Sequence, residues 1–392
     1  MDPVRNPYAP GAGQRPPELA GRDRELTAFD VVLERVARGR PERSLVLVGL
    51  RGVGKTVLLN TLRSAALQRL WGTGKIEARP GQSMRGPISS ALYMAVREIA
   101  PRHRDPERID ALLAVLKAFA LKSGNGKWHP GIDGLPARGR ADTGDLEIDL
   151  MELLGDAAGV ARDVGTGIAL FIDEMQDLLP GDIDALCGAC HELSQTGGPV
   201  VVVGAGLPHL PAVLSAGKSY SERLFRYVRI DRLDREAADR ALAAPASEED
   251  VQFDEAALLD LYAATDGYPY FVQAYGKAVW DAAPASPVTA DDVKVAVPEA
   301  ERELAVGFFG SRYDRATPAE REYMRAMADL GAQTGDAPVL TSAVAAALSR
   351  KPSSLSPTRD GLLKKGLVYA AERGTVSFTV PHFGRFLRRQ GD

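Results

Sequence analysis

The sequence contains little cysteine and no long apolar run. Only two of its 392 residues are cysteines, which excludes a disulfide framework and favours a reducing, cytoplasmic location. No segment approaches the ~18 consecutive apolar residues of a membrane-spanning helix. The first residues are rich in proline, glycine and arginine and lack the apolar stretch of a signal peptide. We therefore expect neither secretion nor a membrane partner.

A strong positive charge is also lacking. The net charge of −4 argues against a wholly basic nucleic-acid-binding protein. Residues 350–392, however, hold nine Lys/Arg and three Asp/Glu, a net charge of +6, which leaves −10 on the preceding residues. A basic end on an acidic body predicts that only this end contacts a polyanion. The length predicts two or three domains.

Short apolar runs alternate with helical patterns in the first half of the chain. Residues 44–49, 168–173 and 199–206 are typical of buried strands, and helical patterns lie between them. This order predicts an α/β fold, a parallel sheet with helices on both faces. Residues 1–20 are predicted to be extended. Within 75–145 we expect a strand at 75–79, helices at 88–100 and 108–122, and a loop or hairpin over 124–144.

A phosphate-binding loop follows the first predicted strand. Residues 49–56 match the pattern G-x-x-x-x-G-K-[ST] between a strand and a helix. Its glycines allow backbone amides to surround phosphates at a helix N-terminus. Lys55 is predicted to reach the β- and γ-phosphates of ATP, and the Thr56 hydroxyl to bind Mg²⁺. The predicted nucleotide-binding residues of this segment are Gly49, Leu50, Arg51, Gly52, Val53, Gly54, Lys55, Thr56 and Val57.

Two adjacent acids end the apolar run at 168–172. Asp173 and Glu174 would lie at the carboxyl edge of the sheet, where buried carboxylates need a counter-ion. Mg²⁺ would supply that counter-ion. Asp173 is predicted to hold the metal and Glu174 to polarise the attacking water. Together with the loop, these acids predict ATP hydrolysis, in which Lys55 and Glu174 are catalytic.

These motifs resemble those of the AAA+/STAND class of P-loop ATPases, within the branch of archaeal-type ATPases and origin-recognition-like initiators. The resemblance rests on residues 20–26, 49–56, 171–178, 201–208, 221–234 and 266–273. It implies that Tyr268 and Pro269 contact the nucleotide from a helical lid. It also implies that Arg223 and Arg226 act catalytically on a neighbouring subunit's nucleotide, which requires a homo-oligomer. Ordinary surface arginines are the alternative for both positions.

The sequence departs from this class in two ways. The strand at 199–206 ends in Gly-Ala-Gly, where a polar residue usually orients the attacking water, so slow hydrolysis without a partner is predicted. Lys55 and Asp173 are 118 positions apart, so residues 75–145 are predicted to be an insertion in an ATPase core spanning 21–233.

The remaining residues predict two further domains. Residues 234–310 show successive helical patterns and are predicted to form the helical lid. Residues 313–392 predict a winged helix, with a first helix opened by a capping box of Thr317 and Glu320, a third helix beginning at Ser356, and a hairpin at 367–380.

The winged helix is predicted to bind double-stranded DNA through its third helix and hairpin. The predicted DNA-binding residues are Ser354, Ser356, Thr358, Arg359, Lys364, Lys365 and Arg373. Three further arginines, Arg385, Arg388 and Arg389, extend the positive field. The chain would then be an ATP-dependent switch or remodeller that acts on DNA. The alternative is a STAND-type signalling ATPase whose winged helix and insertion bind a protein. A small-molecule kinase is the third alternative, and it leaves the lid and winged helix unexplained.

Overall fold

The computed structural model describes residues 1–11, 13–122, 135–218 and 220–390. The larger part of the molecule, called the sheet half below, is built around a five-stranded parallel sheet in the order β2-β3-β4-β1-β5. The strands are β1 (Ser44–Val48), β2 (Gly72–Glu77), β3 (Ile168–Asp173), β4 (Val200–Gly206) and β5 (Phe225–Arg229). Among the described residues, no helix is both long and apolar enough to cross a bilayer.

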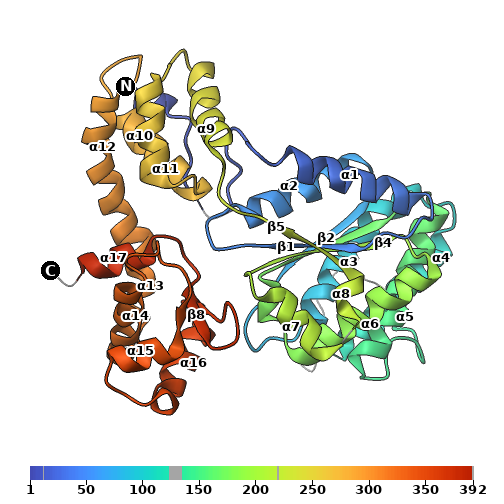
Figure 1. Cartoon of the computed structure of the whole chain (residues 1–392). Coiled ribbons are helices and arrows are strands. Elements are labelled where there is room, and N and C mark those ends of the chain that lie inside the picture. The colour runs from blue at the N-terminus through green and yellow to red at the C-terminus, as the bar shows by residue number, and fades with distance from the viewer. Residues whose placement is uncertain (12, 123–134, 219, 391–392) are drawn as a thin grey trace.

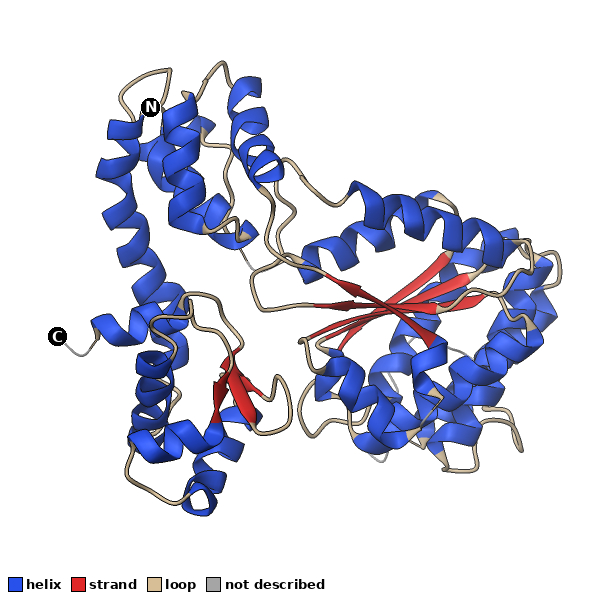
Figure 2. Ribbon diagram, in the orientation of Figure 1, coloured by secondary structure: helices blue, strands red, loops and turns tan. Residues whose placement is uncertain are grey.

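Helices cover both faces of this sheet, as predicted (Figures 1 and 2). On one face α1 and α2 share an apolar core with the sheet, and on the other face α3 to α7 share a second core with it. The helices of this half are α1 (Asp23–Ala37), α2 (Lys55–Gln68), α3 (Arg85–Ile99), α4 (Pro106–Leu121), α5 (Leu146–Asp163), α6 (Pro180–Thr196), α7 (Leu210–Gly217) and α8 (Ser221–Leu224). Short 3-10 turns lie at Pro3–Arg5, Ala100–Arg102 and Met175–Asp177.

The predicted insertion begins too early, because its first residues belong to the sheet. Lys75 to Glu77 are part of β2, which pairs with β3 over its whole length. The helix α3 packs directly onto this strand, and a Cβ at Gly74 would lie 2.4 Å from the Ala91 carbonyl oxygen, so only glycine fits. A buried ion pair between Arg85 and Asp149 (2.8 Å) ties α3 to α5. Part of the loop predicted over 124–144 lies outside the described residues.

Four helices lie within residues 234–310, where the helical lid is predicted. They are α9 (Arg235–Glu248), α10 (Glu255–Thr265), α11 (Pro269–Ala282) and α12 (Ala290–Glu303), and a π-helical segment, Leu304–Gly310, follows them. The N-terminal residues run along this lid without longer regular structure. Tyr8 is buried in the lid core, and its hydroxyl donates to the Leu242 carbonyl (2.5 Å). The extended N-terminal segment is thus fixed in place.

The described part of the C-terminal domain has four helices of seven or more residues and a small antiparallel sheet in the order β6-β8-β7, an arrangement compatible with a winged helix. The predicted capping box of Thr317 and Glu320 is confirmed. The strand β6 and the last helix, α17, were not predicted. The elements are α13 (Ser311–Tyr313), α14 (Pro318–Leu330), β6 (Val339–Leu340), α15 (Thr341–Ala347), a 3-10 turn (Pro352–Leu355), α16 (Ser356–Lys364), β7 (Val368–Tyr369), β8 (Thr375–Phe378) and α17 (Phe383–Arg389).

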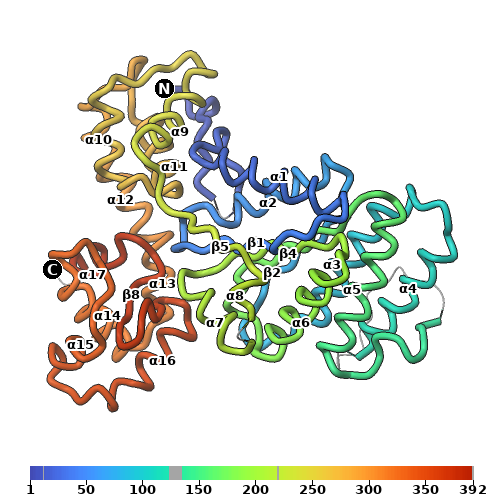
Figure 3. Tube along the Cα trace, turned by 45° about the vertical axis from the view of Figure 1, so that its right-hand side comes forward, coloured from blue at the N-terminus to red at the C-terminus, as the bar shows by residue number. Residues whose placement is uncertain are grey.

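The lid and the C-terminal domain share one apolar core. Phe309, at the end of the π-helical segment, stacks on Phe383 and Phe386 with ring centroids 6.0 and 5.2 Å apart. Figure 3 shows α12 leading directly into the C-terminal domain. The boundary predicted between residues 310 and 313 therefore crosses a continuous hydrophobic cluster, and the two parts are packed as one unit.

Candidate nucleotide-binding site

A cavity of about 490 Å³ lies where the sheet, the lid and the N-terminal segment meet. The predicted loop lines it from Arg51 to Val57, and Asp173 and Glu174 line it from the end of β3. These two motifs come together because β1 and β3 are parallel strands of one sheet, so their carboxyl ends share an edge. The arrangement predicted from the separate motifs is thus present in three dimensions.

The loop has the backbone geometry that surrounds an anion. Gly52 and Gly54 have φ angles of 86° and 89°, a region that favours glycine. Gly54 precedes α2, and no side chain caps that helix. The first amides of α2 therefore remain available to phosphate oxygens, and the helix dipole favours negative charge at the same place. At Gly49 a Cβ would lie 2.2 Å from the Ile230 carbonyl oxygen, which excludes any larger residue.

Lys55 lies at the base of the cavity with its ammonium group turned into the loop. Its Nζ donates to the carbonyl oxygens of Gly49 (2.9 Å) and Leu50 (2.7 Å). Burial lowers the pKa of Lys55 to about 8, although Glu174 and Asp173 favour its charged form. A buried cation held by neutral carbonyls is stabilised further by an anion. These contacts fit the predicted role of Lys55 in binding phosphate.

The acid pair is oriented by an unusual backbone. Glu174 has φ 49° and ψ 42°, a left-handed conformation that is uncommon outside glycine. Its amide donates to Asp173 Oδ1 (3.0 Å). Its carboxylate accepts from Gln176 (2.7 Å) and lies 3.7 Å from the Arg51 guanidinium. Glu174 is thereby held between β3 and the loop.

Gln176 was not predicted as a site residue, yet it links Glu174 to the end of β4. Its Nε2 donates to Glu174, and its Oε1 accepts from the Leu207 amide (3.1 Å). A Cβ at Gly206 would lie 2.6 Å from that Oε1. The Gly-Ala-Gly end of β4 therefore leaves room for Gln176, which supplies a polar group where the strand has none. The sequence signal that could have identified Gln176 is its position two residues after Glu174.

The residues predicted to hold Mg²⁺ fit a metal that binds together with phosphate. Thr56 and Asp173 line the same cavity. Within the described residues, no group of three or more His, Cys, Asp or Glu side chains could hold a metal ion. Few protein ligands are typical of Mg²⁺ that is bound mainly through nucleotide and water. When bound, Mg²⁺ would neutralise charge on the phosphates, and the Thr56 hydroxyl and Asp173 would position it.

The lid lines the cavity with one of the two predicted residues and with others that were not predicted. Pro269 lines the cavity, but Tyr268 does not. Tyr268 packs instead against Phe271 and His382, with ring centroids 6.0 and 5.6 Å away. Tyr270 lines the cavity, and its amide donates to the Gly52 carbonyl (3.2 Å). The helix α11 begins at Pro269. Within its first turn the side chain of Tyr270, rather than that of Tyr268, faces the cavity.

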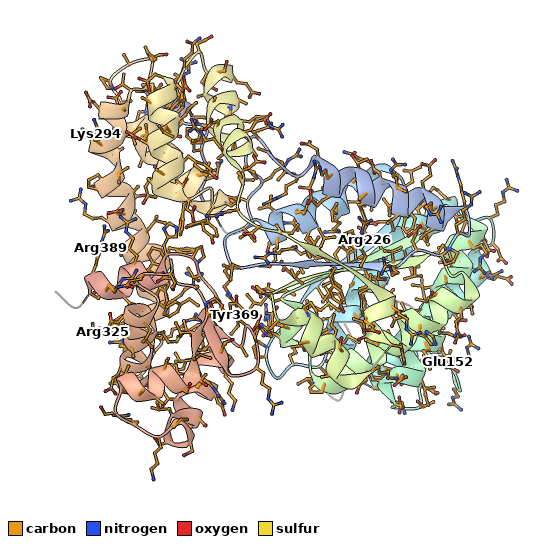
Figure 4. The ribbon with its side chains drawn as sticks, viewed as in Figure 1. Glu152, Arg226, Lys294, Arg325, Tyr369 and Arg389 are labelled. Carbon is orange, nitrogen blue, oxygen red and sulfur yellow. The ribbon has the colours of Figure 1, made fainter. Side chains whose placement is uncertain are left out.

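Arg223 and Arg226 lie away from the cavity. In β5, Arg226 is opposite Leu45, near the start of β1, whereas the loop follows the end of that strand. Figure 4 labels Arg226 on the sheet half of the molecule. Both arginines are exposed, and neither has an ion-pair partner among the described residues. They could act only on another molecule, so their role in a neighbour's site stays a prediction.

The predicted DNA-binding residues fall into two groups. Ser354, Lys364 and Arg373 are exposed, whereas Ser356 and Thr358 are half-buried. Lys365 forms an ion pair with Glu320 (2.5 Å), and Arg359 with Asp360 (3.4 Å). The charges of Lys365 and Arg359 are thus already compensated.

The three arginines near the C-terminus do not extend the positive field as expected. Arg385 and Arg389 both pair with Glu301 of α12 (2.8 and 2.7 Å), and Arg388 pairs with Asp336 (3.0 Å). These contacts fasten α17 to its neighbours. In the described part of residues 350–392, the basic side chains without an ion-pair partner are Lys351, Lys364 and Arg373.

Comparisons with known proteins agree with this site. Residues 18–203 match the AAA ATPase domain family, and residues 306–387 match a domain of unknown function (DUF8462). The fold is similar to that of the Walker-type ATPase PABY2304 of Pyrococcus abyssi, with a TM-score of 0.59, 17% identity and coverage of 95% of this chain and 97% of that chain.

Two further solved structures resemble the chain more distantly. The RuvB Holliday junction branch migration motor of Thermotoga maritima has a TM-score of 0.44 and 19% identity, with 93% of this chain and 96% of that chain covered. Cdc6p of Pyrobaculum aerophilum has a TM-score of 0.43 and 14% identity, with 100% and 99% covered. No curated protein matches the chain.

The phosphate-binding loop, the acid pair and the parallel sheet define a P-loop ATPase. The match over residues 18–203 gives the family more narrowly. Residues 18–203 are therefore an AAA ATPase domain, and the nucleotide-binding core lies in the first half of the sequence.

Proposed function

We propose that the protein is an ATP-driven switch in which nucleotide at the P-loop controls the C-terminal domain, and that this domain binds double-stranded DNA. One hydrogen bond carries the first part of the proposal: the Arg51 amide donates to the Thr379 carbonyl (2.9 Å). Arg51 belongs to the loop that surrounds the phosphates, and Thr379 follows the last strand of the C-terminal domain. A change in the loop on phosphate binding therefore changes this contact.

Two further contacts accompany this hydrogen bond. The Arg51 guanidinium lies against Gly366, where a Cβ would be 3.2 Å from Nη2. His209, just before α7, stacks on Tyr369 of β7, with ring centroids 5.8 Å apart. Figure 4 shows Tyr369 on the side of the C-terminal domain that faces the sheet. No described residue of the C-terminal domain belongs to the two sheet-half cores. A contact without a shared apolar core can open at low cost.

The exposed basic residues support DNA as the target. Lys351, Lys364 and Arg373 lie on or beside α16 and at the tip of the β7–β8 hairpin, where they could contact phosphates. The alternative, a signalling ATPase whose C-terminal domain binds a protein, is favoured by the ion pairs of Lys365, Arg385 and Arg389. Those pairs reduce the charge available to a polyanion.

Slow hydrolysis without a partner is part of the proposal. Gln176 donates to one carboxylate oxygen of Glu174, and Arg51 lies beside the other. These contacts hold the carboxylate while the C-terminal domain rests on Arg51. We expect basal turnover well below the typical enzyme value of ~10 s⁻¹, with acceleration when a partner draws the C-terminal domain away.

The test is the DNA affinity of the full chain at low ionic strength, measured with ADP and with a slowly hydrolysed ATP analogue. We expect at least a ~5-fold difference between the two nucleotides, the lower range of allosteric coupling. Lys55→Ala should abolish the difference, because the phosphates lose their buried cation. Lys294→Ala, an exposed lysine on α12, is the matched control and should preserve it.

Each contrary result has a defined meaning. Equal DNA affinity with both nucleotides would contradict the switch. If the chain shows no salt-dependent DNA affinity under either condition, the DNA target is wrong and the protein-binding alternative takes its place.

A further inference from the structure

The nucleotide cavity contains a cation that neither the loop nor the lid helices supply. Arg312 lines the cavity together with Arg51, Lys55 and Glu174. It belongs to α13, in the short segment that joins the lid to the C-terminal domain. The preceding residues, Leu304–Gly310, are π-helical, a conformation that occurs frequently at functional sites. This segment thus adds a positive charge to those of Arg22, Arg51, Lys55 and Lys75, which also line the cavity.

Stacking, rather than an acid, holds Arg312 in place. Its guanidinium lies 4.3 Å from the centroid of the Phe308 ring and donates to the Phe308 carbonyl. Phe308 in turn stacks on Tyr270, with ring centroids 4.5 Å apart. In the parts of the chain that the structure describes, no carboxylate forms an ion pair with Arg312. The cation is positioned by aromatic contacts and keeps its charge uncompensated.

The surroundings of Arg312 disfavour its charge. Burial lowers its pKa to about 10, and the charges of Arg51 and Arg315 act in the same direction. The Nε of Arg51 is also buried without a hydrogen-bond partner among the described residues. The two guanidinium groups thus line one cavity, where Glu174 lies beside Arg51 but no described carboxylate pairs with Arg312. An anionic ligand would relieve this unfavourable arrangement.

The position of Arg51 indicates which part of the ligand these groups meet. Arg51 lies 3.7 Å from Glu174, the residue assigned to the attacking water. That water must approach the terminal phosphate of ATP. Arg312 lines the same cavity as Arg51, and its stacking partner Phe308 lies beside the loop, where a Cβ at Gly52 would be 3.9 Å from Phe308 Cζ. Arg312 therefore lies beside the part of the loop that contains Arg51, at the end of the cavity where the terminal phosphate is expected rather than the adenine.

We propose that Arg312 binds the terminal phosphate of ATP within the same chain, and that it distinguishes ATP from ADP. The proposal rests on nucleotide binding at the P-loop and adds the residue that senses the third phosphate. Phe309, three residues earlier, stacks on Phe383 and Phe386 of α17. Movement of Arg312 toward phosphate would therefore move a segment that is packed into the C-terminal domain.

The test compares Arg312→Gln with Arg315→Gln in the full chain. Glutamine keeps part of the aliphatic stem over Phe308 and removes the charge. Arg315 lies three residues further on, is exposed and does not line the cavity, so it is the matched control. Binding of ADP and of a slowly hydrolysed ATP analogue is measured with Mg²⁺, for example by calorimetry.

We expect Arg312→Gln to weaken binding of the ATP analogue about 10- to 100-fold, the range for losing a charge-assisted hydrogen bond. ADP binding should change less than about 3-fold, because ADP lacks the third phosphate. Arg315→Gln should change neither. Arg312→Lys should give an intermediate loss, because lysine restores the charge but not the planar stacking group.

Unchanged affinity for the ATP analogue in Arg312→Gln, or equal losses for both nucleotides, would overturn the proposal. Thermal unfolding without nucleotide shows whether the variants fold. If Arg312→Gln is unstable, the ratio of ATP-analogue to ADP affinity in Arg312→Lys decides the question, and an unchanged ratio overturns the proposal. Failure of the wild-type chain to bind either nucleotide is a different result, because it contradicts the proposed function itself.

Discussion

The nucleotide cavity and the C-terminal domain differ in whether their basic side chains are paired with acids. In the cavity, Lys55 is held by neutral carbonyls and Arg312 by an aromatic ring. In the C-terminal domain, Lys365 and three arginines are each paired with an acid. The residue types are the same, and the surroundings differ. Uncompensated charge, rather than the number of basic residues, marks the place where a polyanion is expected.

Apart from Asp360, the acids that compensate the C-terminal charge come from outside the basic stretch. Glu301 belongs to α12, Glu320 to α14, and Asp336 to the loop after α14. Residues 350–392 have a net charge of +6 as a sequence, but folding places them beside acids from earlier segments. The separation of a basic end from an acidic body is therefore much weaker in the folded protein than along the chain.

The largest expected effect is on hydrolysis in the cavity. Glu174→Gln should lower turnover about 100- to 10,000-fold, the range for losing a positioned general base, while ATP binding is retained. Turnover and nucleotide affinity are measured on the same preparations. Glu248→Gln, at the exposed end of α9, is the control and should behave like the wild type. Normal turnover in Glu174→Gln would contradict the assignment of this carboxylate.

Arg223 and Arg226, the exposed arginines of the sheet half, test whether unpaired positive charge outside the cavity also acts on nucleotide. If Arg226 or Arg223 completes a neighbour's site, its alanine variant should bind ATP normally but hydrolyse it about 100-fold more slowly, as when a preorganised donor to the transition state is removed. Mixing with Lys55→Ala protein should restore part of the activity, because each variant supplies the group that the other lacks. Full activity of an ATP-bound monomer would rule out this role.

Protonation of Lys55 gives a pH test of the cavity. Burial lowers its pKa to about 8 in the free protein, and only the charged amine attracts phosphate. Lys55 is charged below pH 8, so ATP affinity should be nearly constant there. Above pH 8 the affinity should fall about tenfold per pH unit, because binding must first protonate the amine. Titration calorimetry between pH 7 and 9.5 measures this slope. A constant affinity up to pH 9.5 would show that Lys55 stays charged without nucleotide.

Within the C-terminal domain, the neighbouring residues Lys364 and Lys365 allow a basic residue without an ion-pair partner to be compared with a paired one. If about three uncompensated basic residues contact phosphates, the logarithm of DNA affinity should fall with the logarithm of salt concentration with a slope of about −2.7. Lys364→Ala should flatten the slope by about 0.9. Lys365→Ala should change it less, because Glu320 already compensates that charge. Equal effects of the two variants would contradict the idea that ion pairing with Glu320 reduces the contribution of Lys365 to DNA binding.

The smallest expected effect comes from releasing the paired arginines. Glu301→Gln removes the partner of both Arg385 and Arg389. The free energy of unfolding should fall by no more than about 1 kcal/mol for each partly exposed pair. The salt slope of DNA binding should steepen, because two positive charges are no longer compensated. Chemical denaturation and DNA titration of the same variant check both expectations. An unchanged slope would place these arginines away from the DNA.

Much of the fold was predictable because its signals are local. The sheet strands β1, β3 and β4 are continuous apolar runs, and the lid helices show helical periodicity. The strand β5 lies partly exposed at the sheet edge, and β6 has only two residues, so neither gives a clear pattern. The helix α17 was missed because it follows the hairpin directly and is only seven residues long.

The sequence by itself determined the P-loop and the acid pair. Each is a short contiguous segment whose chemistry depends on its own backbone and on the end of a strand or the start of a helix. Only the tertiary structure decided which other residues join them. Gln176 fills space left by Gly206, Tyr270 rather than Tyr268 faces the cavity, and Arg312 enters from a segment more than 250 residues after the loop. The pairing of the C-terminal arginines was decided in the same way. Packing and charge compensation depend on distances between segments far apart in the chain, and no local pattern records those distances.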